Sequence, residues 1–333
     1  MLNLTAEGYS APARFHQSYC WLRGRLAAGC TSAAVGQAPT IGYLGSNESA
    51  WSSWTTAFVQ RMRELGWTKD RPIAIEYRWS EGRPDRVAEV AAEFVRSKVD
   101  VIVSYGTAVP ALREATSTVP IVFALAIDPA GAGIVPSLAR PGGNVTGLSI
   151  EQTEAAGKRL ELLRAVIPHL HRLAVIANVA NPQTKREMGA VHSAARALGL
   201  ELAPIEIRRA EDIATGFAAL KGQADGLYIA QDTLTNANRT QIITFAPGAR
   251  LPTIVSGSDF VKAGALMSYG PNYPAMFRRA AEHVDKILRG ANPGEIPVEQ
   301  PTKFDFVINL TTAKAIGLAV PESVLLRADG LIG

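Results

Sequence analysis

The sequence predicts an α/β protein of two doubly wound, parallel-sheet lobes joined by a three-segment hinge. Two observations predict this class. Short apolar segments alternate with amphipathic segments from Ile41 onward, and the alternation ends near Gly147 and then starts afresh. Strands that alternate with helices form a parallel sheet covered by helices on both faces. A chain of 333 residues, 47% hydrophobic and 19% charged, is long enough to fill two such cores.

The first set of elements opens with a strand at residues 41–46. A helix follows, because Trp51, Trp54, Phe58 and Met62 recur three or four residues apart and so share one helical face. The same reasoning predicts strands at 73–79, 99–106, 119–128 and 145–150, and helices at 84–98 and 108–117.

The second set repeats this order and ends in two strands without a long helix between them. It begins with a helix at 154–167 and a strand at 172–179. The pattern then predicts helices at 182–199, 210–222 and 235–246, and strands at 200–207, 224–232, 252–257 and 264–270.

A turn-rich segment near the C-terminus interrupts the second set. The apolar run 265–267 ends in Ser268-Tyr269-Gly270, two prolines flank Asn272-Tyr273, and an amphipathic helix follows at 275–288. We interpret that helix as part of lobe one, and residues 303–310 as a strand that returns to lobe two. Several segments that connect two rigid bodies form a hinge. The resulting division is a leader or disordered segment at 1–38, lobe one at 39–148 plus 272–299, and lobe two at 149–271 plus 300–333, with crossings at about 148, 271 and 300.

Composition and motifs argue against several functional classes. No run of about eighteen apolar residues predicts a transmembrane helix. The net charge of +4 is spread along the chain, which argues against a nucleic-acid partner. The sequence contains no P-loop, dinucleotide-binding glycine motif, zinc-protease motif or nucleophile elbow. His169 and His171 lack a second group of ligands, which favours a surface linker over a metal site. We therefore predict no enzyme, no cofactor and no metal.

The N-terminal segment contains both cysteines, Cys20 and Cys30. The stretch Leu-Ala-Ala-Gly-Cys that ends at Cys30 resembles a lipoprotein processing site, but Arg23 and Arg25 interrupt the apolar region that such a signal needs. A disordered leader, a lipoprotein leader and a misassigned start remain open, and with them peripheral or lipid-anchored association with a membrane.

Polar and aromatic side chains follow the predicted strands at their carboxyl ends, where open α/β sheets bind ligands. The mixture suits a small polar ligand with an apolar portion. Gly106-Thr107, ahead of a helix, is the best candidate for holding an anionic group such as a carboxylate. Each position also suits a helix cap or a turn. The candidates are Ser46, Asn47, Tyr105, Gly106, Thr107 and Asp128 in lobe one, and Asn178, Asn181, Gln231, Asp232, Ser256 and Tyr269 in lobe two.

Two tryptophans lie on the apolar face of the first helix. Core packing is the expected role of Trp54. Trp51 lies in the first turn, near the predicted cleft, and suits either core packing or stacking on a ligand. We include Trp51 among the candidate ligand-binding residues.

Three long stretches resemble the ABC-transporter substrate-binding family that includes the tryptophan/tyrosine-binding proteins. They are "FVKAGALMSYGPNY" at 260–273, "VFALAIDPAGAGIVPSLARPGGNVTGLS" at 122–149 and "FDFVINLTTAKAIGLAVPESVLLRAD" at 304–329. The resemblance covers about residues 40 to 330. It implies a type I periplasmic-binding-protein fold, a periplasmic or otherwise extracytoplasmic location, a small-molecule ligand, and partnership with an ABC permease and its separate ATPase. It also implies cleft contacts from Ser46, Asn47, Tyr105, Gly106, Thr107, Asp128, Asn178, Asp232, Ser256 and Tyr269.

The resemblance leaves the ligand open, with an aromatic amino acid or a related carboxylate as the leading interpretation. The alternative function is a ligand-sensing regulatory domain, although the first forty residues show no helix-turn-helix pattern. A third hypothesis, an enzyme that uses Asp128 or Asp232, has no assembled nucleophile, metal or cofactor motif to support it. We expect a monomer.

Overall fold

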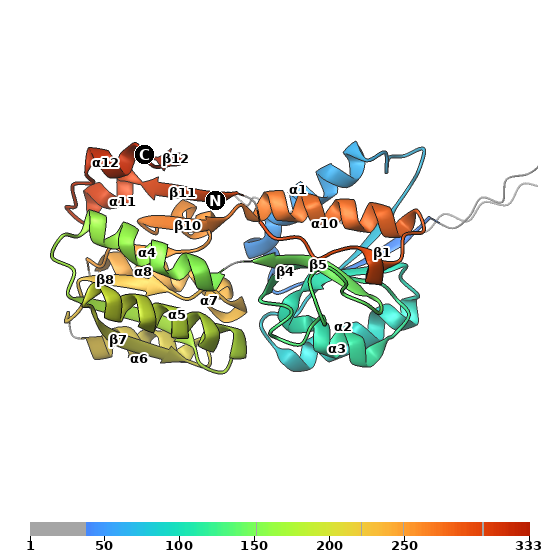
Figure 1. The fold of residues 1–333 in the computed structure, drawn as a ribbon, viewed down its shortest axis with the longest axis horizontal. Coiled ribbons are helices and arrows are strands. Elements are labelled where there is room, and N and C mark those ends of the chain that lie inside the picture. The colour runs from blue at the N-terminus through green and yellow to red at the C-terminus, as the bar shows by residue number, and fades with distance from the viewer. Residues whose placement is uncertain (1–37, 151, 221, 249, 302) are drawn as a thin grey trace, which may run out of the picture. The chain divides into compact units, whose positions relative to one another are not determined.

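The structure is a computed structural model that describes residues 38–333 apart from 151, 221, 249 and 302. The expectations for the leader, including Cys20 and Cys30, lie outside the described residues. Within them the chain forms two α/β lobes (Figure 1). The predicted fold class is confirmed.

Lobe one contains a five-stranded sheet in the order β2-β1-β3-β4-β5, in which every neighbouring pair is parallel. Its strands form because apolar runs such as Ile41–Leu44 are buried on both faces. Its elements are β1 (Thr40–Gly45), α1 (Glu48–Glu64), β2 (Ala74–Trp79), α2 (Pro84–Ser97), β3 (Val101–Tyr105), the 3-10 turn η1 (Gly106–Ala108), α3 (Val109–Ala115), β4 (Ile121–Ile127) and β5 (Val145–Ile150).

Helix α10 (Tyr273–Leu288) comes late in the sequence and packs on lobe one. It lies beside α1 (Figure 1, right). Its buried side chains Phe277, Ala280 and Val284 belong to the same hydrophobic cluster as Trp51 and Phe58 of α1. The short 3-10 turn η2 (Pro293–Glu295) follows. Lobe one is therefore completed by residues that five strands of the second sheet, β6 to β10, separate in sequence from its other elements.

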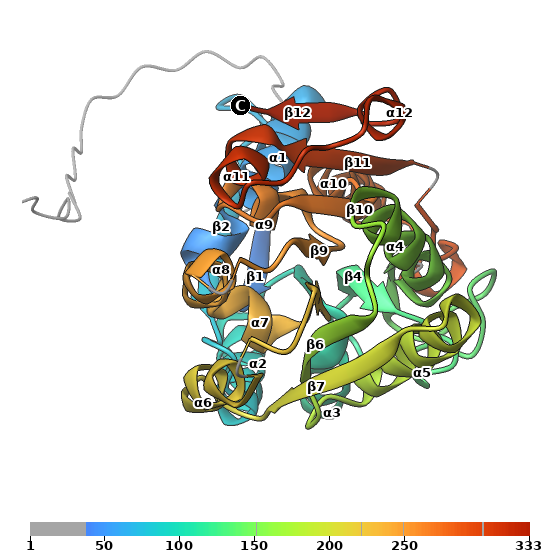
Figure 2. The same cartoon turned by 90° about the vertical axis from the view of Figure 1, so that its left-hand side faces the viewer.

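Lobe two contains a seven-stranded sheet in the order β12-β11-β10-β9-β8-β6-β7, which Figure 2 shows from top to bottom. One pair, β10–β11, is antiparallel, whereas the sequence predicted an all-parallel sheet. The direction of β11 is reversed because the chain returns to lobe two from lobe one after α10. Its elements are α4 (Gln152–Val166), β6 (Arg172–Asn178), α5 (Pro182–Leu198), β7 (Glu201–Ile207), α6 (Glu211–Leu220), β8 (Gly226–Ile229), α7 (Thr233–Ala237), α8 (Arg239–Gly248), β9 (Thr253–Val255), α9 (Ser258–Lys262), β10 (Met267–Pro271), β11 (Phe304–Asn309), α11 (Leu310–Ala315), α12 (Glu322–Leu325) and β12 (Gly330–Ile332).

A buried ion pair holds the helices of lobe two to its sheet. The Arg159 guanidinium of α4 donates to Glu187 Oε1 of α5 at 3.0 Å and to the hydroxyl of Tyr228 in β8 at 2.7 Å. The Tyr228 hydroxyl donates to the same carboxylate at 2.7 Å. Burial raises the pKa of Glu187, and the neighbouring Arg159 cation opposes that shift. The network fixes α4 and α5 against the central strand β8.

Two segments next to lobe crossings, the end of β5 and the residues around Glu299, are hydrogen-bonded to each other. The Ser149 N–H donates to the Glu299 carbonyl at 2.8 Å, and the Glu299 N–H donates to the Gly147 carbonyl at 3.1 Å. Gly147 has no room for a side chain, because a Cβ there would lie 2.1 Å from the Phe123 carbonyl oxygen. The expected boundary at 148 falls inside β5, which continues to pair with β4 as far as Ile150. The first crossing thus begins after Ile150.

Candidate functional site

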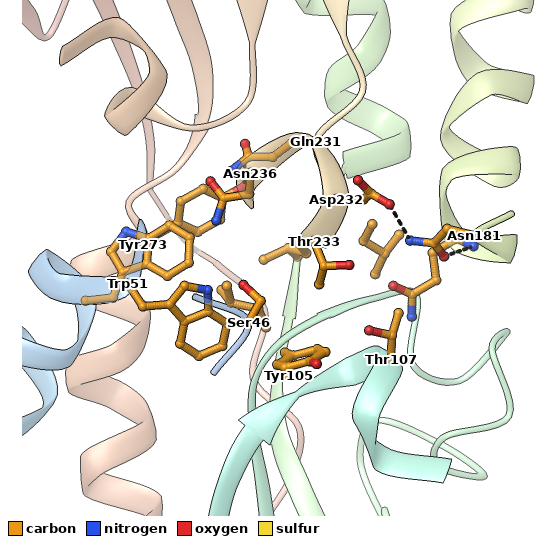
Figure 3. Close-up of a pocket in the computed structure, with 15 residues that line it drawn as sticks. Ser46, Trp51, Tyr105, Thr107, Asn181, Gln231, Asp232, Thr233, Asn236 and Tyr273 are labelled. Carbon is orange, nitrogen blue, oxygen red and sulfur yellow. Dashed lines mark hydrogen bonds between the residues drawn. The ribbon is translucent and has the colours of Figure 1, made fainter. Parts of the chain in front are cut away.

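A pocket of about 560 Å³, counting its mouth, is lined by residues of both lobes. Its walls come from the carboxyl ends of β1, β3, β4, β5 and β8, from the loop after β6, and from the first turns of α1, α5, α7 and α10, as expected for ligand sites of open α/β sheets. The lining residues are Ser46, Trp51, Trp54, Tyr105, Thr107, Leu125, Ile127, Ile150, Asn181, Gln183, Gln231, Asp232, Thr233, Asn236 and Tyr273 (Figure 3).

Four aromatic rings form one wall of the pocket. The rings of Trp51 and Tyr105 meet edge to face, with centroids 5.6 Å apart. The Trp54 ring lies 5.1 Å from that of Tyr273 and stacks on Phe277 at 5.5 Å. These rings belong to the lobe-one core, and all four residues are buried, so the aromatic wall is the edge of that core that faces the pocket.

Hydrogen bonds fix the orientation of the two tyrosines in this wall. The Tyr105 and Ser80 hydroxyls lie 2.8 Å apart. Burial raises the pKa of Tyr105, and the bond to Ser80 opposes this, so the phenol is neutral at physiological pH. The Tyr273 hydroxyl lies 3.1 Å from Ser256 Oγ, which donates to Gln231 Oε1 at 2.5 Å. Ser256 does not line the pocket itself, but its hydroxyl orients two residues that do, Gln231 and Tyr273.

The opposite wall is polar and centres on Asp232. Its Oδ1 accepts a hydrogen bond from the Thr235 N–H at 2.9 Å, as the N-cap of α7. Its Oδ2 accepts from the side-chain amides of Asn178 at 2.5 Å and Asn181 at 3.3 Å. A carboxylate has about four lone-pair sites. Asp232 is thus held rigidly. Its Oδ1 also lies 3.2 Å from the Thr235 hydroxyl, which lies equally close to the Ala230 carbonyl oxygen, so a ligand donor can occupy the fourth site when the hydroxyl donates to Ala230.

Comparison with known proteins identifies the family. The model of the ABC transporter substrate binding protein family matches residues 51–332. The chain belongs to this family.

Individual relatives agree with this assignment. The substrate-binding protein described here is 28% identical over 266 residues to a protein of Clostridioides difficile (strain R20291) named "Tyrosine-binding protein", covering 78% of this chain and 75% of the relative. It also resembles the structure of an ABC domain in complex with L-Trp from Streptococcus pneumonia, with a TM-score of 0.81 and 24% identity over 89% of this chain and 100% of that one. The ligand-free, open structure of a Clostridium difficile substrate-binding protein with adhesive properties gives a TM-score of 0.64 and 26% identity, covering 88% and 99%.

Seven of the residues predicted from the sequence line the pocket of this substrate-binding protein: Ser46, Trp51, Tyr105, Thr107, Asn181, Gln231 and Asp232. Asn178 and Ser256 do not line it and instead hydrogen-bond to residues that do. Asn47, Gly106, Asp128 and Tyr269 lie outside the lining.

Local packing explains why two of these positions lie outside it. A Cβ on Gly106 would lie 2.6 Å from Ala126 Cβ, so the glycine allows η1 to approach β4. Tyr269 stacks on Phe304 at 5.7 Å on the antiparallel pair β10–β11, and Tyr273, four residues later at the start of α10, lines the pocket instead.

Asp128 connects the lobes at the surface. Its backbone has a φ of 41°, and its carboxylate accepts hydrogen bonds from the Gly131 N–H at 3.0 Å and from Arg186 of α5 at 2.9 Å. Its side chain is 49% exposed. The Arg186 guanidinium also donates to the Gly131 carbonyl oxygen.

The sequence analysis missed several lining residues. Trp54 was expected only in the core, yet it lines the pocket and its Nε1 donates to Asp259 of α9 at 2.5 Å. Thr233 and Asn236 follow Asp232 on α7, and the signal that could have found them is their position in the turn after a strand. Gln183 lies in the first turn of α5. Tyr273 could have been found from its place at the start of a helix that leaves the crossing.

The described residues contain no helix long and apolar enough to cross a membrane, and no group of three or more His, Cys, Asp or Glu side chains placed to hold a metal ion.

Proposed function

We propose that this substrate-binding protein is the extracytoplasmic solute-binding component of an ABC importer, and that it binds an aromatic amino acid or a related carboxylate in the pocket. The observation that carries the proposal is the pairing of an aromatic wall with a polar wall that holds one carboxylate, Asp232. The relative named a tyrosine-binding protein and the structural neighbour complexed with L-Trp support the same ligand class.

The two walls suit the two ends of such a ligand. Edge-to-face and stacked contacts with Trp51 and Tyr105 favour a flat ring. The Asp232 carboxylate would accept a charge-assisted hydrogen bond from an ammonium group, which is about twice as strong as a neutral one. The Thr107 hydroxyl lies on the Asn181 side of the pocket (Figure 3), and both it and the Gln183 amide line the pocket and can donate to the ligand carboxylate.

Because the pocket is shared by two lobes, ligand binding can change how the lobes are arranged, and a permease can recognise that change. A ligand that contacts both walls stabilises the arrangement in which both walls reach it, and so shifts the population of lobe arrangements. A permease that recognises this arrangement would accept only the loaded protein. In this proposal the protein binds and releases the ligand without changing it chemically.

The ligand class can be tested by thermal shift and calorimetry on the purified chain. Tyrosine, tryptophan and phenylalanine are compared with leucine, glycine, nucleosides and sugars. A ligand at about one hundred times its Kd adds about 2.7 kcal/mol to the free energy of unfolding and raises Tm. We expect a shift from at least one aromatic amino acid and none from sugars. Absence of a shift with every aromatic amino acid, or turnover of the compound that binds, would contradict the proposal.

The importer role needs a separate experiment in cells. Cells that lack the protein should take up less of the labelled ligand at low concentration, and fractionation should find the protein outside the cytoplasm. Normal uptake in the deletion strain would contradict the importer role and leave ligand binding standing.

A further inference from the structure

We propose that Ser46 and Asn236 form a polar subsite that recognises a hydroxyl or N–H group carried by the ring of the ligand. The protein would then select tyrosine and tryptophan over phenylalanine. This inference rests on the proposed function, because it assumes an aromatic amino acid in the pocket. We call the two residues the ring subsite.

Each residue of the ring subsite holds a buried polar atom with no hydrogen-bond partner among the described residues. Ser46, between β1 and α1, is 1% exposed, and its Oγ has no partner. Asn236, on α7, is 5% exposed, and its side-chain Oδ1 has none. Buried polar groups in folded proteins are nearly always hydrogen-bonded, because an unsatisfied one keeps its full desolvation penalty.

The two atoms differ from the other buried polar atoms without a partner in one respect. Ser46 and Asn236 both line the pocket, one from each lobe. Ser104 Oγ, Thr184 Oγ1 and Ser268 Oγ also lack partners in the described part of the chain, but these residues lie outside the pocket lining. A ligand in the pocket is therefore positioned to satisfy the first two atoms and not the others.

Their place in the pocket indicates which part of the ligand they meet. Figure 3 draws Ser46 and Asn236 on the side of Trp51 and Tyr273, and Asp232 with Asn181 on the other side. An amino acid with its ammonium group at Asp232 would place its ring against the tryptophan and its ring substituent at the ring subsite.

The chemistry of the ring subsite suits a neutral donor. An amide oxygen accepts a hydrogen bond, and a serine hydroxyl can both donate and accept. A phenol O–H or an indole N–H would donate to Asn236 Oδ1 or Ser46 Oγ. Phenylalanine would leave both atoms unpaired.

The test measures the affinities of three ligands for four proteins by calorimetry. The ligands are L-tyrosine, L-tryptophan and L-phenylalanine, and the proteins are the wild type, Ser46→Ala, Asn236→Leu and the control Ser104→Ala. Ser104 is a matched control, because its hydroxyl is also buried without a partner in the described residues and lies outside the pocket lining.

The wild type should bind tyrosine or tryptophan about ten- to a hundredfold more tightly than phenylalanine, because phenylalanine leaves a buried polar atom unsatisfied. Ser46→Ala and Asn236→Leu should each reduce that preference about tenfold, chiefly by weakening the preferred ligand, whereas Ser104→Ala should leave it unchanged. The melting temperature of ligand-free Ser46→Ala should not fall, because the lost hydroxyl has no partner in the described structure.

Three outcomes would overturn the ring subsite. Phenylalanine could bind as tightly as both other ligands, the two variants could weaken all three ligands equally, or Ser104→Ala could reduce the preference as strongly. Equal weakening by Ser46→Ala would assign Ser46 to the amino acid head group. Binding of none of the three ligands to the wild type would instead contradict the proposed function, so the two failures are distinguishable.

Discussion

The two walls of the pocket are built in different ways. The aromatic wall, which we define by Trp51, Trp54, Tyr105 and Tyr273, consists of side chains that also pack in the core of lobe one. The polar wall, which we define by Asn181, Asp232 and Thr233, consists of side chains at the ends of strands, held by hydrogen bonds to neighbouring amides. None of these three belongs to a hydrophobic cluster of the described residues.

Because of this difference, substitutions in the two walls should affect stability and ligand affinity differently. A change in the aromatic wall removes core packing together with ligand contact, so stability and affinity should fall together. A change in the polar wall that keeps its size should weaken binding and leave stability almost unchanged. The lobes thus contribute differently to one site: lobe one supplies the aromatic area together with the hydroxyls of Ser46 and Thr107, and lobe two supplies Asp232 and the side-chain amides.

The largest effect is expected at Asp232. Asp232→Asn keeps a good N-cap for α7 but removes the charge. We expect the affinity for an aromatic amino acid to fall about a hundredfold or more, because loss of one member of a hydrogen-bonded charge pair costs about 2–5 kcal/mol. Titration calorimetry measures the affinity, and the melting temperature should stay within a few degrees of wild type.

A matched control for this change is Asp225→Asn. Asp225 accepts the backbone N–H groups of His171 and Arg172 at 2.8 Å, outside the pocket lining, and the substitution alters the net charge equally. Affinity close to wild type in Asp232→Asn, or an equal loss in Asp225→Asn, would show that the polar wall does not bind an ammonium group.

The second largest effect is expected at Trp51, where both the stability of the fold and the affinity for the ligand should fall. Trp51→Leu should reduce the free energy of unfolding by about 2–4 kcal/mol, because large-to-small changes in a core leave a cavity. It should weaken ligand binding about tenfold through lost ring contact. Denaturant unfolding and calorimetry measure the two effects.

The control variant Trp67→Leu separates the loss of stability from the loss of ligand affinity. Trp67 is buried in the same cluster, and its Nε1 donates to Asp285 at 2.9 Å, away from the pocket lining. We expect a comparable loss of stability with unchanged affinity. Loss of affinity in Trp67→Leu as large as in Trp51→Leu would mean that the aromatic wall acts only through stability.

A smaller effect is expected at the surface pair that joins the lobes beside the pocket. Asp128→Asn removes the ion pair with Arg186 and suits the positive φ of this position, because asparagine tolerates the left-handed region. An exposed pair contributes about 0.2–1 kcal/mol, so affinity should fall less than about fivefold. The difference from wild type should shrink at high salt.

A loss of more than tenfold that salt does not reduce would place Asp128 in the ligand site. Lobe one would then supply a charged ligand-binding group in addition to the aromatic wall.

The smallest effect is expected at a buried histidine of α10, the helix that begins with Tyr273 of the aromatic wall. His283 of α10 is buried, its Nε2 lies 3.2 Å from Glu299 Oε1, and Arg279 and Lys286 are close enough to influence its charge. Burial lowers the pKa of His283 below its ordinary value of 6.5, although Glu299 opposes the shift. The unfolded chain therefore binds this proton more readily, so His283 should reduce stability as the pH falls below 6.5 and have no such effect above it.

Melting temperatures measured between about pH 5 and pH 8 check this expectation. His283→Gln should lose part of the acid-side decline that the wild type shows, and the curves should run parallel above neutral pH. Identical acid-side slopes in the two proteins would contradict the expectation.

The order of strands and helices was predictable from the sequence alone, because hydrophobic periodicity is a local property of the chain. This periodicity identified the strand ends, and thereby Ser46, Tyr105, Thr107, Asn181, Gln231 and Asp232, as candidates before any contact was known. Trp51 became a candidate from its place in the first turn of a predicted helix. The resemblance of long ordered stretches identified the family, which the family model confirms.

Tertiary structure alone decided which of the candidates meet. Trp54 and Asp259 are 205 residues apart in sequence and hydrogen-bonded in space. Tyr273 lines the pocket instead of Tyr269 because the antiparallel pair β10–β11 turns one ring toward Phe304 while α10 turns the other inward. Periodicity shows that a face is buried but not which neighbour covers it, and contacts across two lobes depend on where the chain crosses between them. The pocket therefore follows from the packing of distant segments, which no local pattern contains.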